Sequence, residues 1–404
     1  MMLAKVLAPK LKDAGVKKYR KTADRFAEHI IANGDAPFSL GSHGTDELIS
    51  ISFDDEDYIQ LEKIQTEFFG ELPDLIERVA SATSDLTARS TVRHWRENRY
   101  LELRQLDAFR INLEDRWGDG LDFLRVLLSL SLEIGQEFHE RLAKSRARKN
   151  RSLRVALSRL HIRACQVARE VLVLLENGLA DGAMARWRTL HEIATVALVI
   201  DNGGDGLAKR YLAYDIVEQK KALDQYIQDH EALGYAPPSV REAKRTNAAF
   251  EEAIKEFGSN FGQPYGWAAE YLTLKTPRFV DIQKAAGRAM MQSHYKMASY
   301  NVHATPRALS FRLGSLNQPD FLVAGSSNAG IDEPGQNLAF SLVQITSKLC
   351  DSPSLDDIVA MKTLVALRDK AVEELIAAAK RLVRDDREVR RVLNEQGVSA
   401  DVIW

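Results

Sequence analysis

A continuous helical pattern of apolar residues from Val155 to Ile200 constrains the fold of this chain more than any other feature. Apolar side chains recur there at intervals of three and four residues, which is typical of helices that bury one face. The pattern is interrupted at Asn177-Gly178, two residue types that commonly end a helix. We therefore expect a pair of long antiparallel helices at the centre of the fold, the second ending at the glycine-rich segment 202–206.

Composition places the chain among globular proteins. Apolar residues make up 45% and charged residues 28% of the 404 positions, as in an ordinary protein with a buried core. The formal net charge is −2, so no overall positive field attracts nucleic acid, and any such binding requires a local basic patch. Helical patterns dominate, and the predicted fold class is mainly α.

Three regions are expected. Residues 1–150 form a mostly helical N-terminal region, residues 151–355 form a core helical bundle with a polar site, and residues 356–404 form a charged C-terminal helix.

Details of the N-terminal region follow from local patterns. Residues 1–33 show the periodicity of one or two amphipathic helices. Alternation around Ile49, Ile51 and Phe53 indicates a short strand or an extended arm. Pro73 is expected to start a new helix, and the segment from Trp117 to Gly120 is expected to form a turn.

Basic segments occur at residues 10–25, 89–110 and 144–154. Acidic residues interleave with the arginines of 89–110, which favours a salt-bridged surface helix over a nucleic-acid interface. The segment 144–154 is expected to be a linker or a solvated helix end, with phosphate contact as the alternative.

The remaining sequence signals limit compartment and cofactors. Cys165 and Cys350 lie in apolar stretches, which favours two buried thiols over a disulfide. The basic N-terminus lacks the apolar core of a secretory signal, and the apolar runs are too short to cross a bilayer. We expect a cytoplasmic protein without membrane contact, and neither a metal nor a cofactor, since no metal-ligand, phosphate-loop or nucleophile-elbow motif is present.

Two polar sets stand out within the predicted core. Arg188 and Glu192 are one turn apart on an otherwise apolar helix, where a buried arginine requires a carboxylate partner. Tyr295, Ser299 and His303 recur every four residues, so we expect them in one stripe on a second helix, where they could form a hydrogen-bond chain. If the two helices face each other, these five residues meet. Each set is explained either by a buried structural network or by a functional site.

These motifs resemble those of an uncharacterised bacterial family that carries only a domain-of-unknown-function label. Its pattern is an Arg-x-Leu-x-Glu helix followed at a distance by Tyr-x-x-x-Ser-x-x-x-His, matched here by Arg188, Leu190 and Glu192 and by Tyr295, Ser299 and His303, over roughly residues 155–350. The family is in turn similar to the HEPN superfamily of helical proteins, many of which are ribonucleases or toxin components in defence against phage.

The HEPN resemblance implies a specific chemistry. HEPN nucleases cut RNA without a metal, with a histidine that assists attack of the 2′-hydroxyl and an arginine that neutralises the developing charge, and usually act as dimers. Four Arg/His pairs have a suitable spacing on one helix: Arg89/His94, Arg154/His161, Arg186/His191 and Arg288/His294. The corresponding positions before His303 hold Lys296, Met297 and Ala298. A site of Arg188 and His303 would therefore come from two helices.

Two functional hypotheses follow. The first is an HEPN-like, metal-independent protein that binds or cleaves RNA, plausibly in phage defence or a toxin-like role, and as a homodimer. In it Arg188 binds phosphate, Glu192 orients Arg188, His303 is acid or base, and Tyr295 and Ser299 support His303. The second is a non-catalytic helical sensor or scaffold, in which the Arg/Glu/His cluster is structural and protein partners dock on the N-terminal region.

Overall fold

A computed structural model describes residues 2–39, 49–146, 148–316, 324–352 and 354–396. In these ranges every regular element is a helix, which confirms the mainly α class. Contacts divide the chain into two compact units, residues 1–103 and 104–404.

The first unit begins with two packed helices, α1 (Met2–Asp13) and α2 (Tyr19–Asn33). Their facing sides bury Leu7, Leu11, Ala23 and Ala27. This confirms the predicted amphipathic helices within residues 1–33, and Pro9 is accommodated inside α1.

The segment after α2 is an arm and not a strand. Glu47 and Leu48 lie outside the described residues, and 49–54 have no regular structure. Apolar residues occupy alternate positions at Ile51 and Phe53 because both side chains pack against the α1–α2 core. The strand alternative was therefore wrong, since helices are the packing partners of this segment.

A single helix, α3 (Asp55–Lys144), extends over 90 residues. Its first turn is capped reciprocally: Asp57 N–H donates to Asp54 Oδ1 at 3.0 Å, and Asp54 N–H donates to Asp57 Oδ2 at 2.8 Å. Pro73 lies inside this helix, so the prediction that it starts a new one was wrong.

The predicted turn from Trp117 to Gly120 was also wrong, because these residues continue α3. Trp117 is buried, and its Nε1 donates to the Asn328 carbonyl at 3.1 Å. A Cβ on Gly120 would meet Leu375 Cδ2 at 2.8 Å. Gly120 therefore permits close helix packing and does not mark a turn.

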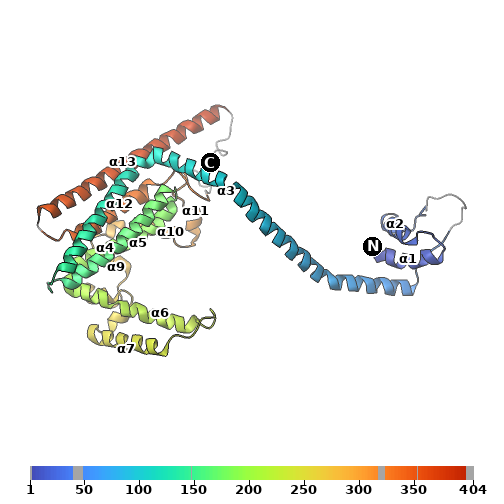
Figure 1. Cartoon of the computed structure of the whole chain (residues 1–404), viewed down its shortest axis with the longest axis horizontal. Helices are drawn as coiled ribbons and strands as arrows, with labels where there is room; N and C mark the ends of the chain where they lie inside the picture. Colours follow the sequence, from blue (N-terminus) through green and yellow to red (C-terminus); the bar gives the residue numbers. More distant parts are fainter. Residues whose placement is uncertain (1, 40–48, 147, 317–323, 353, 397–404) are drawn as a thin grey trace. The chain divides into compact units, whose positions relative to one another are not determined.

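The second unit is built on α4 (Arg151–Glu176) and α5 (Ala180–Ala213), which lie side by side (Figure 1). They are joined at Gly178, whose φ of 69° lies in the left-handed region that favours glycine. This confirms the predicted helix pair and its break. Residues 145–150, part of the basic segment 144–154, connect α3 to α4.

The predicted end of the second helix at the glycine-rich segment 202–206 corresponds to a break inside α5, where two helical segments meet at Gly204. The chain continues helically to Ala213, with a kink at Gly204 (φ 72°, ψ −163°). Leu207 and Ala208, directly after the kink, are buried, so packing carries the helix past the interruption.

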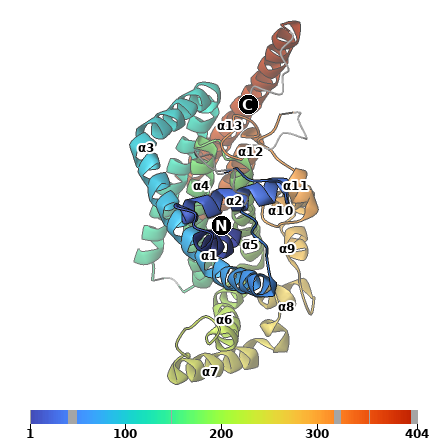
Figure 2. The ribbon, with the colours of Figure 1, turned by 90° about the vertical axis from the view of Figure 1, so that its right-hand side faces the viewer.

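The region after α5 is a series of shorter helices. Both views place α6 (Asp215–Asp229) and α7 (Val240–Phe257) at one end of the α4–α5 pair (Figures 1 and 2). There follow α8 (Ala269–Leu272), α9 (Phe279–Ala285), α10 (Gln292–Tyr300) and α11 (Pro306–Ser310).

Two C-terminal helices complete the second unit: α12 (Asp332–Thr346) and α13 (Leu355–Glu395). Leu338 and Leu342 of α12 and Leu364, Leu375 and Leu382 of α13 belong to the same buried cluster as α4 and α5. The last helix is thus part of the packed core.

Cys165 is buried and Cys350 half-buried, and both are free thiols. Among the helices described, none combines the length and apolarity needed to cross a membrane.

Candidate functional site

Arg188 and Glu192 project from α5, whose opposite side is held in the core. Trp187, Leu190 and Ala194 are fully buried. Arg188 and Glu192 are half-buried, and Arg188 Nε donates to Glu192 Oε1 at 3.2 Å across one helical turn. The pair therefore lies at the edge of the core and not inside it.

Tyr295 of α10 joins this pair. Its hydroxyl donates to Glu192 Oε1 at 2.6 Å and accepts from Arg188 Nη2 at 2.8 Å. The Arg188 guanidinium carbon also lies 4.6 Å from the centre of the Tyr295 ring, within the range of a cation–π contact. The three side chains form a closed hydrogen-bonded triangle that fixes the direction of the guanidinium.

His303 completes the cluster from outside the helix. The predicted Tyr295–Ser299–His303 stripe on one helix was wrong in its last member, because α10 ends at Tyr300. The next residues turn, and His303 N–H donates to the Ser299 carbonyl at 3.1 Å. The turn places His303 Nε2 at 3.3 Å from Arg188 Nη1, and the His303 side chain is exposed.

Ser299 does not link the tyrosine to the histidine through its side chain. Its hydroxyl donates to the Tyr295 carbonyl at 2.8 Å, a bond within α10. Such a bond satisfies the hydroxyl locally. Ser299 contributes to the site through its carbonyl, which anchors the turn that carries His303.

Protonation in the site follows from burial and pairing. Burial and the bond to Glu192 raise the pKa of Tyr295 above its ordinary value, so it remains a neutral hydrogen-bond donor. Burial alone would lower the pKa of Arg188, but its bonds to Tyr295 and Glu192 outweigh burial and raise it. The triangle thus contains one fixed cation, one carboxylate and one neutral phenol.

A second layer, missed by sequence reasoning, supports Tyr295. The ring of Phe279 from α9 lies 4.8 Å from the Tyr295 ring. His191 is buried next to it and pairs with Gln283 of α9 (Nε2···Nε2 2.9 Å). Burial lowers the pKa of His191 to about 4, so it is neutral near pH 7. No periodic signal marks α9, because it has only seven residues.

The four Arg/His pairs with HEPN-like spacing have other surroundings. Arg89 and His94 are both exposed on α3. His161 and His191 are buried, and their upstream arginines form ion pairs elsewhere, Arg154 with Asp351 and Arg186 with Glu170. His294 Nδ1 lies 3.1 Å from Glu333 Oε1. Only the fifth combination, Arg188 with His303, places an exposed imidazole within hydrogen-bonding distance of a fixed guanidinium among these pairs.

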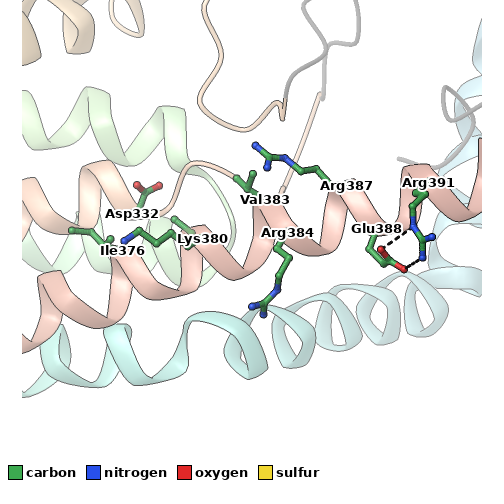
Figure 3. A pocket seen from close by; sticks show the side chains of 9 residues that line it. Asp332, Ile376, Lys380, Val383, Arg384, Arg387, Glu388 and Arg391 are labelled. Atoms are coloured by element: carbon green, nitrogen blue, oxygen red, sulfur yellow. Dashed lines mark hydrogen bonds and ion pairs between the residues drawn. The ribbon is translucent and has the colours of Figure 1, made fainter.

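A separate open pocket of about 680 Å³ lies along α13. Figure 3 shows its basic side chains, Lys380, Arg384, Arg387 and Arg391, with Arg384 and Arg387 pointing to opposite sides of the helix. Arg391 pairs with Glu388 at 2.5 Å. The lining combines these four basic side chains with two carboxylates, Asp332 and Glu388, and three apolar side chains. It has no histidine or cysteine for acid–base or nucleophilic chemistry near neutral pH. In the part of the chain that is described, no three His, Cys, Asp or Glu side chains are grouped as metal ligands.

The fold and the site together define an all-α protein whose polar cluster lies where two helices and the turn after the second one meet. Residues 154–320 match the model of a family of unknown function, DUF5677, and this segment contains all five residues of the cluster. The match confirms the resemblance to a family without a characterised function. No curated protein and no solved structure matches this chain.

Proposed function

We propose that this protein binds RNA and cleaves it without a metal ion at the Arg188–His303 pair. The observation that carries the proposal is the 3.3 Å distance between Arg188 Nη1 and the exposed His303 Nε2. An imidazole, a group that can accept or donate a proton, thereby lies beside a permanent positive charge, at a place that solvent and ligands can reach. This is the pair of groups that phosphodiester transesterification requires.

The chemical step assigns a role to each group. The phosphate first replaces His303 as the acceptor for Arg188 Nη1, which frees the lone pair of His303 Nε2. His303 Nε2 then accepts the proton of the ribose 2′-hydroxyl, and the 2′-oxygen attacks the adjacent phosphorus. Arg188 stabilises the extra negative charge on the phosphoryl oxygens as it develops. The P–O5′ bond then breaks, the 5′-oxygen takes a proton from water, and the hydroxide that remains takes the proton from His303, which restores the free imidazole. The products are a 2′,3′-cyclic phosphate and a free 5′-hydroxyl.

Glu192 and Tyr295 are positioning residues in this scheme. Their bonds occupy Arg188 Nε and Nη2, which leaves Nη1 directed toward His303. A guanidinium held by two partners loses less side-chain entropy when it binds phosphate. The basic pocket on α13 adds a surface that suits the RNA backbone, since backbone phosphates are recognised mainly through charge.

The test is cleavage of end-labelled RNA by the full-length protein in excess EDTA. Matched oligonucleotides that carry a single 2′-deoxy substitution at the cleaved position are the control. We expect cleavage of RNA, a cyclic phosphate on the product, and loss of cleavage at the substituted position. Cleavage of DNA at an equal rate, or a requirement for added Mg²⁺, would contradict the proposed chemistry.

The alternative is a non-catalytic helical scaffold, and one observation favours it. Arg188 is paired with Glu192 and Tyr295 in a triangle that joins α5 to α10, as a purely structural network would be. A scaffold requires the triangle but has no use for the exposed His303. Loss of function in a stable His303 variant therefore separates the two proposals.

A further inference from the structure

The first half of α3 exposes a row of large apolar side chains. Phe68 is 44%, Leu75 45%, Val79 57% and Leu86 68% exposed. Rows of this length on a soluble protein usually mark an interaction surface. The row lies within the first unit, on a helix whose other positions are mostly polar.

The spacing of these residues is that of a coiled coil. Between Leu61 and Leu86, seven of the eight positions a and d of a heptad repeat are apolar, and only Gln65 is polar. The complete set is Leu61, Gln65, Phe68, Leu72, Leu75, Val79, Ala82 and Leu86. The next three such positions are Arg89, Arg93 and Arg96, so the apolar seam ends at Leu86. Its 26 residues correspond to about 39 Å of helix, close to four heptads.

We propose that two copies of this chain pair through residues 61–86 of α3 as an antiparallel coiled coil. The occupant is a second copy because the seam is complementary to itself when reversed. Leu61 then faces Leu86 of the second copy, Phe68 faces its Val79, and Leu72 faces its Leu75. Each residue and its partner exchange places across the twofold axis, as a closed symmetric dimer requires.

Charge selects the antiparallel orientation. Glu71 and Arg78 occupy flanking g positions of adjacent heptads, and the antiparallel register places Glu71 beside Arg78 of the second copy. On the other flank, Phe69 lies beside Ile76 of the second copy. A parallel dimer instead places Glu71 beside Ile76 and Arg78 beside Thr83, which leaves both charges without an oppositely charged neighbour. Both Glu71 and Arg78 are exposed, so each is accessible to a partner.

The first test is the mass of the full chain by sedimentation equilibrium. We expect twice the monomer mass of 45.3 kDa at micromolar concentration. Glu71→Arg places like charges together twice across the axis and should raise the dimer Kd on the order of tenfold. The double variant Glu71→Arg/Arg78→Glu should restore it. Glu77→Arg makes the same charge change at an outward f position and should leave the Kd unchanged.

The second test reads the register through disulfides. Phe68→Cys mixed with Val79→Cys should form a cross-linked dimer under oxidation, since these positions face each other. Each variant alone should not, because like positions are offset by about 16 Å along the axis, far beyond disulfide reach. The wild-type chain controls for Cys165 and Cys350.

Three outcomes would overturn the proposal. One is a wild-type monomer throughout the micromolar range, which would assign the seam to another protein. Another is an equal dimer Kd for the Glu71→Arg variant and the Glu77→Arg variant. The third is self-cross-linking of Phe68→Cys alone, which would indicate parallel pairing. Circular dichroism of each variant separates loss of pairing from loss of helix.

Discussion

Arg188 and His303 are 115 residues apart in sequence, yet Arg188 Nη1 lies 3.3 Å from His303 Nε2. Two structural elements produce this contact. Helix α5 carries the arginine at the edge of a tightly packed core, and the turn after α10 carries the histidine. Glu192 and Tyr295 hold the guanidinium from one side, which leaves the side facing His303 available.

His303→Ala should leave stability nearly unchanged. The side chain is exposed, so its removal creates no cavity and leaves no buried group without a partner. We expect a change in unfolding free energy within about 0.5 kcal/mol. Thermal denaturation followed by circular dichroism measures this. A loss of several kcal/mol would mean that His303 is part of a structural network.

Arg188→Ala should be moderately destabilising. It leaves Glu192 without its ion-pair partner and removes a bond from the Tyr295 hydroxyl. Loss of a partner from a fully buried ion pair costs about 3–5 kcal/mol. The side chains of Arg188 and Glu192 are 22% and 36% exposed, and water at the site reduces this cost, so we expect about 1–3 kcal/mol. Urea denaturation provides the value, with Arg163→Ala, an exposed arginine on α4, as control. If Arg188→Ala and Arg163→Ala were equally stable, this would contradict a stabilising role for the Arg188–Glu192–Tyr295 triangle.

Acid should destabilise the protein through two buried histidines. Burial lowers the pKa of both His161 and His191 to about 4, from an ordinary value of 6.5. Between these values the unfolded chain binds protons that the folded chain does not, so stability falls as the pH drops from 6.5 toward 4. At about pH 5 the loss is about 2 kcal/mol for each histidine.

His191→Asn removes one of these two titrating groups. We expect its unfolding free energy to fall about half as steeply as that of the wild type between about pH 7 and pH 5. Denaturant titrations at the two pH values measure the slopes. The same slope in both proteins would show that His191 does not titrate differently in the two states.

Gly120→Ala should destabilise the second unit although alanine favours helix. The added Cβ meets Leu375 Cδ2 at 2.8 Å, and Leu375 is fully buried between α3 and α12. Overpacking of this kind costs about 1–3 kcal/mol. Gly70→Ala is the matched control, because a Cβ there meets nothing within 4 Å and should be neutral or stabilising. Equal effects in thermal denaturation would contradict the close contact at Gly120.

Sequence reasoning predicted the elements whose signals are local. The α4–α5 pair follows from helical periodicity and the break at Gly178, and the helix at 355–395 follows from the same pattern. Sequence reasoning failed where tertiary contacts give a residue a role that its local sequence does not indicate. Trp117 and Gly120 resemble a turn in sequence, but in α3 one fills the core and the other makes room for Leu375.

The site was predictable in its membership but not in its geometry. Spacing alone placed Tyr295, Ser299 and His303 on one helical stripe, whereas α10 ends at Tyr300. The turn after Tyr300 depends on a backbone bond from His303 to Ser299, which has no side-chain signature. The seam on α3 was missed because a turn predicted at 117–120 and a helix start predicted at Pro73 divided one 90-residue helix into pieces.

The most direct test of the central claim is the rate of RNA cleavage in EDTA by the wild type and two single-histidine variants. His303→Ala removes the proposed base, and general base catalysis contributes about 10²–10⁴-fold, so its rate should fall by at least about a hundredfold. His94→Ala removes another exposed histidine, from the Arg89/His94 pair on α3, and should retain the wild-type rate. A folded His303→Ala protein that cleaves as fast as the wild type would contradict the assignment of the Arg188–His303 pair as the reactive centre.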